Sequence, residues 1–107
     1  MITEQELYTL LSEGMELPVA YDHFKQLDGI TISLPFILFR VDETTTFKAD
    51  DKSLFKQNNY MIDLVTEIKD TKNEEKLEDL LNDNNLPYDK FEDYIENENI
   101  YQIRYFI

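Results

Sequence analysis

The sequence predicts an α+β fold, in which two helices pack on a mainly antiparallel sheet of about four to five strands. Two segments carry leucines at helical spacing behind a capping signal, and most other apolar residues alternate as they do in strands. Consecutive strands joined by turns favour antiparallel pairing. The expected element order is α-β-β-β-α-β(β). The 107 residues predict a single domain, residues 1–107, with one core.

The first predicted helix covers about residues 4–13. Thr3 and Glu6 form a Thr-x-x-Glu capping box at its start. A stripe of leucines follows at helical spacing and is expected in the core: Leu7, Leu10 and Leu11. Gly14 is expected to end the helix.

Three strands are predicted between the helices, over residues 19–24, 34–41 and 60–68. Asp28-Gly29 is a turn signal between the first two. The second strand is apolar on both faces until Arg40, which predicts a central place in the sheet. Alternation in the third strand predicts two opposite faces: Tyr60, Ile62, Leu64 and Ile68 on one, Asp63 and Glu67 on the other.

A polar stretch, residues 42–59, separates the second and third strands. It carries seven charged residues, interrupted by Phe47, Leu54 and Phe55. We interpret it as a long excursion between two strands, either a loop or an extension of their hairpin. Long loops in compact domains often carry function.

The second predicted helix covers about residues 72–84. Thr71 and Glu74 form a second capping box, in which Thr71 is the expected N-cap. The leucines at helical spacing are expected to face inward: Leu77, Leu80 and Leu81. The acids between them are expected on the outside: Glu74, Glu75, Glu78 and Asp79. Pro87 prevents the helix from continuing.

The C-terminal part mixes aromatic and acidic residues. Residues 88–96 predict a short strand or an irregular turn, and residues 100–107 predict the last strand. Its expected core face holds Tyr101, Ile103, Tyr105 and Ile107, and its half-exposed face holds Ile100, Gln102, Arg104 and Phe106. For Arg104 we favour an ion pair within its own subunit over one with a neighbour.

Composition narrows the function classes. The chain has 23 acidic and 10 basic residues, a net charge of −13, which argues against a basic nucleic-acid-binding surface. It has no cysteine, which excludes disulfides and thiolate chemistry. The longest apolar run is far below the roughly 20 residues of a membrane helix, and the N-terminal residues do not resemble a signal peptide. A cytosolic protein, or one packaged from the cytosol, is expected.

The residues that usually carry catalysis are sparse. The glycines are isolated, no serine lies in a nucleophile elbow, and His23 is the sole histidine, without a recognisable partner. Four acids are candidates for a cation site: Asp42, Glu43, Asp50 and Asp51. EF-hand spacing is missing, so a solvated loop is favoured. We therefore predict no enzyme, no cofactor and no metal site.

Six segments, taken in order, resemble a known family. They are LPVAYDHF at 17–24, LPFILFR at 34–40, FKADDK at 47–52, YMIDLVTEIKD at 60–70, EKLEDLL at 75–81 and YIENENIYQIRY at 94–105. Together they resemble the small tail-completion proteins of long-tailed phages and Gram-positive prophages, which are grouped with tail terminators. The resemblance spans residues 4–106 and departs at 64–66, where an aromatic residue is expected before Thr66.

The resemblance implies a mechanical role. Tail terminators form rings, typically hexamers, which cap the tail tube and meet the neck or connector of the head. The implied location is the virion tail, and the host bacterial cytoplasm during assembly. DNA would pass through the ring without specific binding, and an acidic lumen would repel its phosphates, although acidity also serves solubility.

A closed ring needs two different contact surfaces on each subunit. The interface residues that we expect are Phe47, Asp50, Asp51, Leu54, Phe55 and Arg104. In the alternative interpretation, the apolar residues of the polar stretch form a small satellite core. Two other function classes stay open: an acidic binding module or inhibitor that mimics nucleic acid, and a small metal-dependent enzyme.

Overall fold

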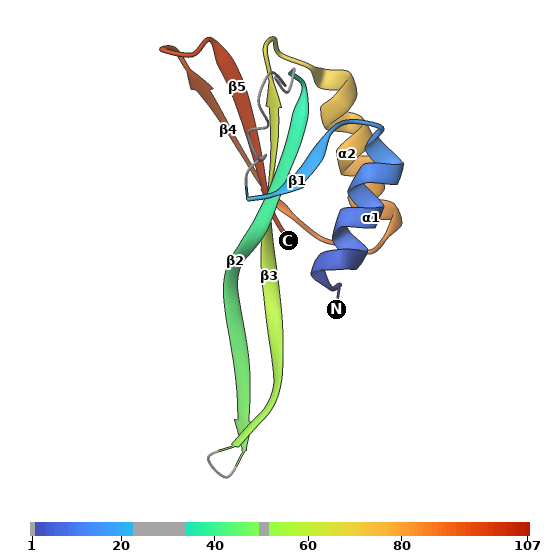
Figure 1. Ribbon diagram of the computed structural model, residues 1–107, viewed down its shortest axis with the longest axis vertical. Helices are drawn as coiled ribbons and strands as arrows, with labels where there is room; N and C mark the ends of the chain where they lie inside the picture. Colours follow the sequence, from blue (N-terminus) through green and yellow to red (C-terminus); the bar gives the residue numbers. More distant parts are fainter. Residues whose placement is uncertain (1, 23–33, 50–51) are drawn as a thin grey trace, which may run out of the picture.

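Figure 1 shows the computed structural model, which describes residues 2–22, 34–49 and 52–107, and only the backbone of residues 43–49 and 52–57. The elements follow the predicted order: α1 (Glu4–Met15), β1 (Val19–Tyr21), β2 (Phe36–Ala49), β3 (Lys52–Thr66), α2 (Thr71–Asp83), β4 (Asp89–Ile95) and β5 (Ile100–Phe106). Several predicted features lie outside the described residues: His23, the end of the first strand, the turn at 28–29, Asp50 and Asp51.

The five strands of the described residues form one mixed sheet in the order β1-β2-β3-β5-β4. β1 runs parallel to β2, and the other neighbouring pairs are antiparallel, so the α+β prediction with a mainly antiparallel sheet is confirmed. The parallel direction of β1 was not predicted. β2 has a neighbour on each side, which confirms its central place. In the part of the chain described, neither helix is long and apolar enough to cross a membrane.

The core lies between the two helices and one face of the sheet, with α1 and α2 side by side on that face (Figure 1). Its largest fully buried side chains are Tyr105 and Phe39. The rest of the buried cluster comes from both helices and from three strands: Leu7, Leu11, Met15, Ile37, Tyr60, Ile62, Leu64, Leu77, Leu81 and Ile103. We call the opposite face, away from the helices, the outer face.

The start of α1 was predicted correctly and its end was not. Thr3 is the N-cap, and its side chain and that of Glu6 form the reciprocal capping box. The helix runs through Gly14 and ends at Met15, with Glu16 as a left-handed C-cap at a φ of 57°. A Cβ atom on Gly14 would lie 2.7 Å from both methyl carbons of Leu80. Gly14 therefore serves the close approach of α1 to α2 instead of ending the helix.

The polar stretch is a hairpin extension, so the alternative of a loop is wrong. β2 and β3 stay paired from Phe36↔Val65 to Ala49↔Lys52, with register shifts after Val41 and Phe47. We call residues 43–49 and 52–59 the hairpin arm. In the described part of the chain, β5 pairs with β3 only over Met61–Thr66, so the arm residues pair only with each other. The arm extends well beyond the helices (Figure 1).

The predictions for α2 need two corrections. Asp70, not Thr71, is the N-cap: its Oδ1 accepts a hydrogen bond from the Asn73 backbone N–H at 3.1 Å. Aspartate is a strong capping residue, and it precedes Thr71, which becomes the first helical residue. Glu74, expected on the outside, is 4% exposed. The inward leucines are confirmed, with Leu77 and Leu81 fully buried.

The strands near α2 also differ from expectation at one position. β3 ends at Thr66, so Ile68 is not on the core face but 70% exposed. The strand alternative for residues 88–96 is confirmed by β4. The two faces of β5 are as predicted: Ile103 and Tyr105 are buried in the core, whereas the alternate residues lie half-buried on the outer face.

Candidate functional site

The expected interface residues that the structure describes fall at two separate places, and Asp50 and Asp51 lie outside the described residues. Phe47 and Phe55 are directly paired in the hairpin arm, where Leu54 also lies. Arg104 lies on β5, opposite Asp63 of β3. Phe55 and Asp63 are eight residues apart along one strand, which corresponds to about 26 Å. Arg104 is therefore not part of the arm surface. The choice between interface and satellite core for the arm's apolar residues stays a prediction, because those side chains are not described.

The accessible part of the outer face lies over β4 and β5. Toward β3 this face is buried, since Met61 and Val65 are only 4% and 6% exposed. Over β4 it carries an aromatic ring between two exposed acids, Asp89, Phe91 and Asp93, at alternate positions of the strand. Phe91 is 60% exposed, which is unusual for so large an apolar side chain.

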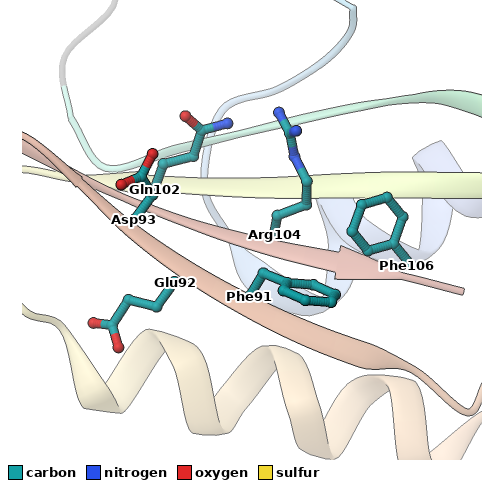
Figure 2. A pocket seen from close by; sticks show the side chains of 6 residues that line it. All are labelled: Phe91, Glu92, Asp93, Gln102, Arg104 and Phe106. Atoms are coloured by element: carbon teal, nitrogen blue, oxygen red, sulfur yellow. The ribbon is translucent and has the colours of Figure 1, made fainter.

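A hollow of about 370 Å³ opens on this part of the sheet (Figure 2). It is lined by Phe91, Glu92, Asp93, Gln102, Arg104 and Phe106. The rings of Phe91 and Phe106 meet edge to face, with centroids 5.5 Å apart. An exposed aromatic pair with polar groups around it is typical of an interaction surface. Figure 2 shows Glu92 turned away from the rings, toward α2.

Arg104 is fixed at one side of the hollow by an ion pair within its own chain, as predicted. Its Nε donates to Asp63 Oδ1 at 2.7 Å, and its Nη2 donates to Asp63 Oδ2 at 3.2 Å. This hydrogen bonding to Asp63 raises the pKa of the Arg104 guanidinium, and burial only partly opposes it. The charge of Arg104 is thus compensated. Within the described residues, neither Asp89 nor Asp93 forms an ion pair, so the hollow is bordered by net negative charge.

Arg104→Gln is expected to lower the free energy of unfolding by about 1–2 kcal/mol, because it leaves the part-buried Asp63 carboxylate without its two charged donors. Urea unfolding followed by circular dichroism measures this loss. Arg40→Gln is the matched control, since Arg40 lies 3.7 Å from Asp22 and both side chains are about half exposed. Its expected loss is below about 1 kcal/mol. Equal losses would mean that the Asp63 pair contributes no more than a surface pair.

A polar cluster that the sequence did not predict joins α2 to β4 and β5. Glu74 Oε1 lies 3.0 Å from Lys69 Nζ and 2.9 Å from Lys90 Nζ. Glu78 accepts hydrogen bonds from Lys90 and from the Tyr105 hydroxyl, both at 3.1 Å. A lysine on an edge strand is ordinarily solvated, so the sequence around Lys90 does not indicate an ion pair. The pairing becomes visible only once the strand order is known, because that order places β4 beside β5 and near α2.

The pKa shifts of the cluster favour a charged Glu74 and a protonated Tyr105. Burial raises the pKa of Glu74, but the hydrogen bonds and charges of Lys90 and Lys69 outweigh burial, and the net pKa is lowered. Burial, and then Glu78, raise the pKa of the Tyr105 hydroxyl. A general acid at neutral pH needs a carboxyl pKa near 7. Glu74 is shifted in the opposite direction, which favours its charged, ion-paired form.

Among residues 2–22, 34–49 and 52–107, no group of three or more acidic or histidine side chains is placed to hold a metal ion. The acidic set 42, 43, 50 and 51 falls partly outside this part of the chain. No protein-family model matches the chain, and a search of curated proteins finds no relative. Within the described residues, the hairpin arm and the hollow over β4 and β5 are the two candidate interaction surfaces.

Proposed function

We propose that the protein is a structural virion assembly protein, a tail terminator or head–tail joining protein. In this role it caps the tail tube as a ring of copies, a hexamer on the tail, and connects the tube to the neck. The observation that carries the proposal is the hairpin arm, a two-stranded extension that leaves the body of the fold (Figure 1). Such an arm can contact a neighbouring molecule without disturbing the core of the subunit that carries it.

The arrangement of surfaces supports a ring. Head-to-tail contacts that close by rotation need two different patches on one subunit, placed apart from each other. The arm and the hollow are different in composition and lie at separate places along β3 and β5. The resemblance of residues 4–106 to tail-completion proteins supports the same class. The proposed partners are the tail tube protein and the neck protein, with DNA passing through and not specifically bound.

The distribution of acids favours assembly over nucleic-acid mimicry. A mimic needs its carboxylates in one continuous stripe that follows a phosphate backbone. Here the exposed acids of the described residues are spread over both helices, β2, β4 and the segments between elements: Glu4, Glu6, Glu13, Glu16, Asp22, Asp42, Glu67, Glu75, Asp79, Asp83, Asp89, Glu92, Asp93, Glu96 and Glu98. The net charge of −13 is consistent with a channel whose negative charge repels the phosphates of passing DNA, so that the DNA is not bound.

An arm-replacement variant tests the proposed function. Thr44 and Asn58 are Cα partners, so an Asn-Gly pair in place of residues 45–57 closes the hairpin with a two-residue turn. We expect this variant to fold, because the new turn leaves the pairing of β1 with β2 and of β5 with β3 untouched. We expect it to fail to complete tails, because it lacks the arm. The measurement is complementation of a phage that lacks this gene, with infectious titre and electron microscopy of tails as readouts.

The control for this experiment is Glu75→Gln, an exposed change on α2 that should complement as the unchanged protein does. Circular dichroism and thermal melting confirm that both variants fold. We expect the arm-replacement variant to give the same infectious titre as the phage that lacks the gene. We expect Glu75→Gln to restore the titre fully. Full complementation by a folded variant without its arm would contradict the proposal.

A further inference from the structure

The hollow over β4 and β5 has the chemistry of a receptor for an apolar and basic segment. The edge-to-face pair of Phe91 and Phe106 offers an exposed apolar surface. Asp89 and Asp93 flank Phe91 on the exposed strand, and Arg104 is neutralised by Asp63. The volume of about 370 Å³ lies at the lower end of ligand pockets, about 300–1,000 Å³, and is enough for an aromatic side chain.

The hairpin arm has the complementary composition. In a chain with only ten basic residues, three of them lie between positions 44 and 57: Lys48, Lys52 and Lys56. The arm together with its turn, residues 43–59, also has three acids, so its net charge is zero, whereas the whole chain has −13. Phe47 and Phe55 are directly paired in the arm, and Lys56 pairs with the residue just before Phe47. The arm thus combines phenylalanines with a concentration of lysines on an otherwise acidic molecule.

The arm does not meet the hollow of its own chain. β2 and β3 carry it away from β4 and β5 in a continuous two-stranded ladder, so the two surfaces lie at separate parts of the molecule (Figure 1). A contact between them therefore joins two copies. Because the surfaces differ, the same contact repeats from copy to copy in a head-to-tail manner.

We propose that the arm of one copy docks in the hollow of the next, with arm phenylalanines against Phe91 and Phe106 and arm lysines near Asp89 and Asp93. This inference rests on the proposed assembly function and names its partner, a second copy of this chain. Opposite charges between exposed groups weaken with salt over a Debye length of about 8–10 Å. Each copy also carries a net charge of −13, which repels the other copy more strongly at low salt, so the copies are compared at one fixed ionic strength.

Thiol cross-linking tests the docking directly, because the chain has no cysteine of its own. Ser53→Cys places a thiol on the arm, and Gln102→Cys places one in the hollow, without changing any charge. The two purified variants are mixed at micromolar concentration with a short thiol-specific cross-linker. The Ser53–Gln102 product should exceed the product with a Thr9→Cys control on α1 by about tenfold, because docking raises the effective concentration of the two thiols.

A third variant tests whether the hollow itself is responsible. Adding Phe91→Ser to Gln102→Cys should reduce the cross-linked product to the level of the Thr9→Cys control. Equal products with Gln102→Cys and Thr9→Cys, or no effect of Phe91→Ser, would overturn the inference and leave the hollow to a basic segment of another protein.

The outcome separates the docking from the proposed function. If the arm-replacement variant fails to complete tails while cross-linking is unselective, the assembly role stands and the docking is wrong. If cross-linking is selective while that variant completes tails normally, the docking stands and the assembly role is wrong.

Discussion

Ile103→Ala is expected to lower the free energy of unfolding by about 2–5 kcal/mol, the range for truncating a fully buried aliphatic side chain. Ile103 is 1% exposed and lies in the middle of β5, with Leu64 as its partner on β3 and Glu92 on β4. The substitution leaves a cavity where the sheet meets the helices, and the neighbouring strands restrict collapse around it. Urea unfolding monitored by far-ultraviolet circular dichroism gives the change from the shift in midpoint.

The neighbouring position provides the control. Gln102 lies on the outer face of the same strand and is half-buried, so Gln102→Ala should change stability by less than about 1 kcal/mol. The two variants differ in face but not in strand, pairing or helix content. A larger loss for Gln102→Ala than for Ile103→Ala would mean that the core lies on the other side of the sheet.

Glu74→Gln is expected to cost about 2–3 kcal/mol at pH 7, somewhat below the range of about 3–5 kcal/mol for breaking a fully buried pair. Glu74 is 4% exposed and compensates Lys69 and Lys90. The cost is reduced because both lysines keep another carboxylate, Glu92 for Lys69 and Glu78 for Lys90. The exposed neighbour Glu75 gives the matched control, since Glu75→Gln should be nearly neutral.

The same carboxylate should make stability depend on pH in the acidic range. The pKa of Glu74 is lowered from its ordinary value of 4.5, so the unfolded chain takes up the proton at a higher pH than the folded protein. The stability contributed by Glu74 is therefore complete above about pH 5 and is lost as the pH falls through 4.5 and the lower folded-state pKa. Between pH 6 and pH 3 the free energy of unfolding should fall less in Glu74→Gln than in Glu75→Gln. Parallel pH profiles would contradict this assignment.

Local signals predicted most of the elements because they depend on neighbours in sequence. The Thr3 capping box, the leucine stripes and the alternation of β5 each act within a few residues. The errors arose where a stronger or more distant interaction competed. Asp70 caps α2 in place of Thr71, and Gly14 serves the contact with Leu80 on the other helix.

The candidate site was less accessible to sequence reasoning. Arg104 was expected to pair within its own chain, but its partner Asp63 is 41 positions away and becomes a neighbour only through the pairing of β3 with β5. The hollow depends on the order of β5 and β4 at the edge of the sheet, which alternation does not specify. The sequence indicates Glu74 as one more surface acid, because nothing near it in sequence shows that Lys90 lies beside it in the fold.

The hairpin arm also divides β3 into two parts with different resistance to local opening. From Tyr60 onward, β3 is held on both sides, by β2 and by the C-terminal strand, and Tyr60 and Ile107 exchange backbone hydrogen bonds of 3.3 and 2.9 Å. Among the described residues, each strand of the arm has a single neighbour, and a two-stranded hairpin alone is marginally stable in water. We therefore expect the amide protons of Met61–Thr66 to exchange with solvent only through global unfolding. The amide protons of the arm should exchange through local opening that leaves the core intact. β3 thus spans two cooperative units, the arm and the core sheet. The arm can change its conformation against another surface with little effect on the stability of the core sheet.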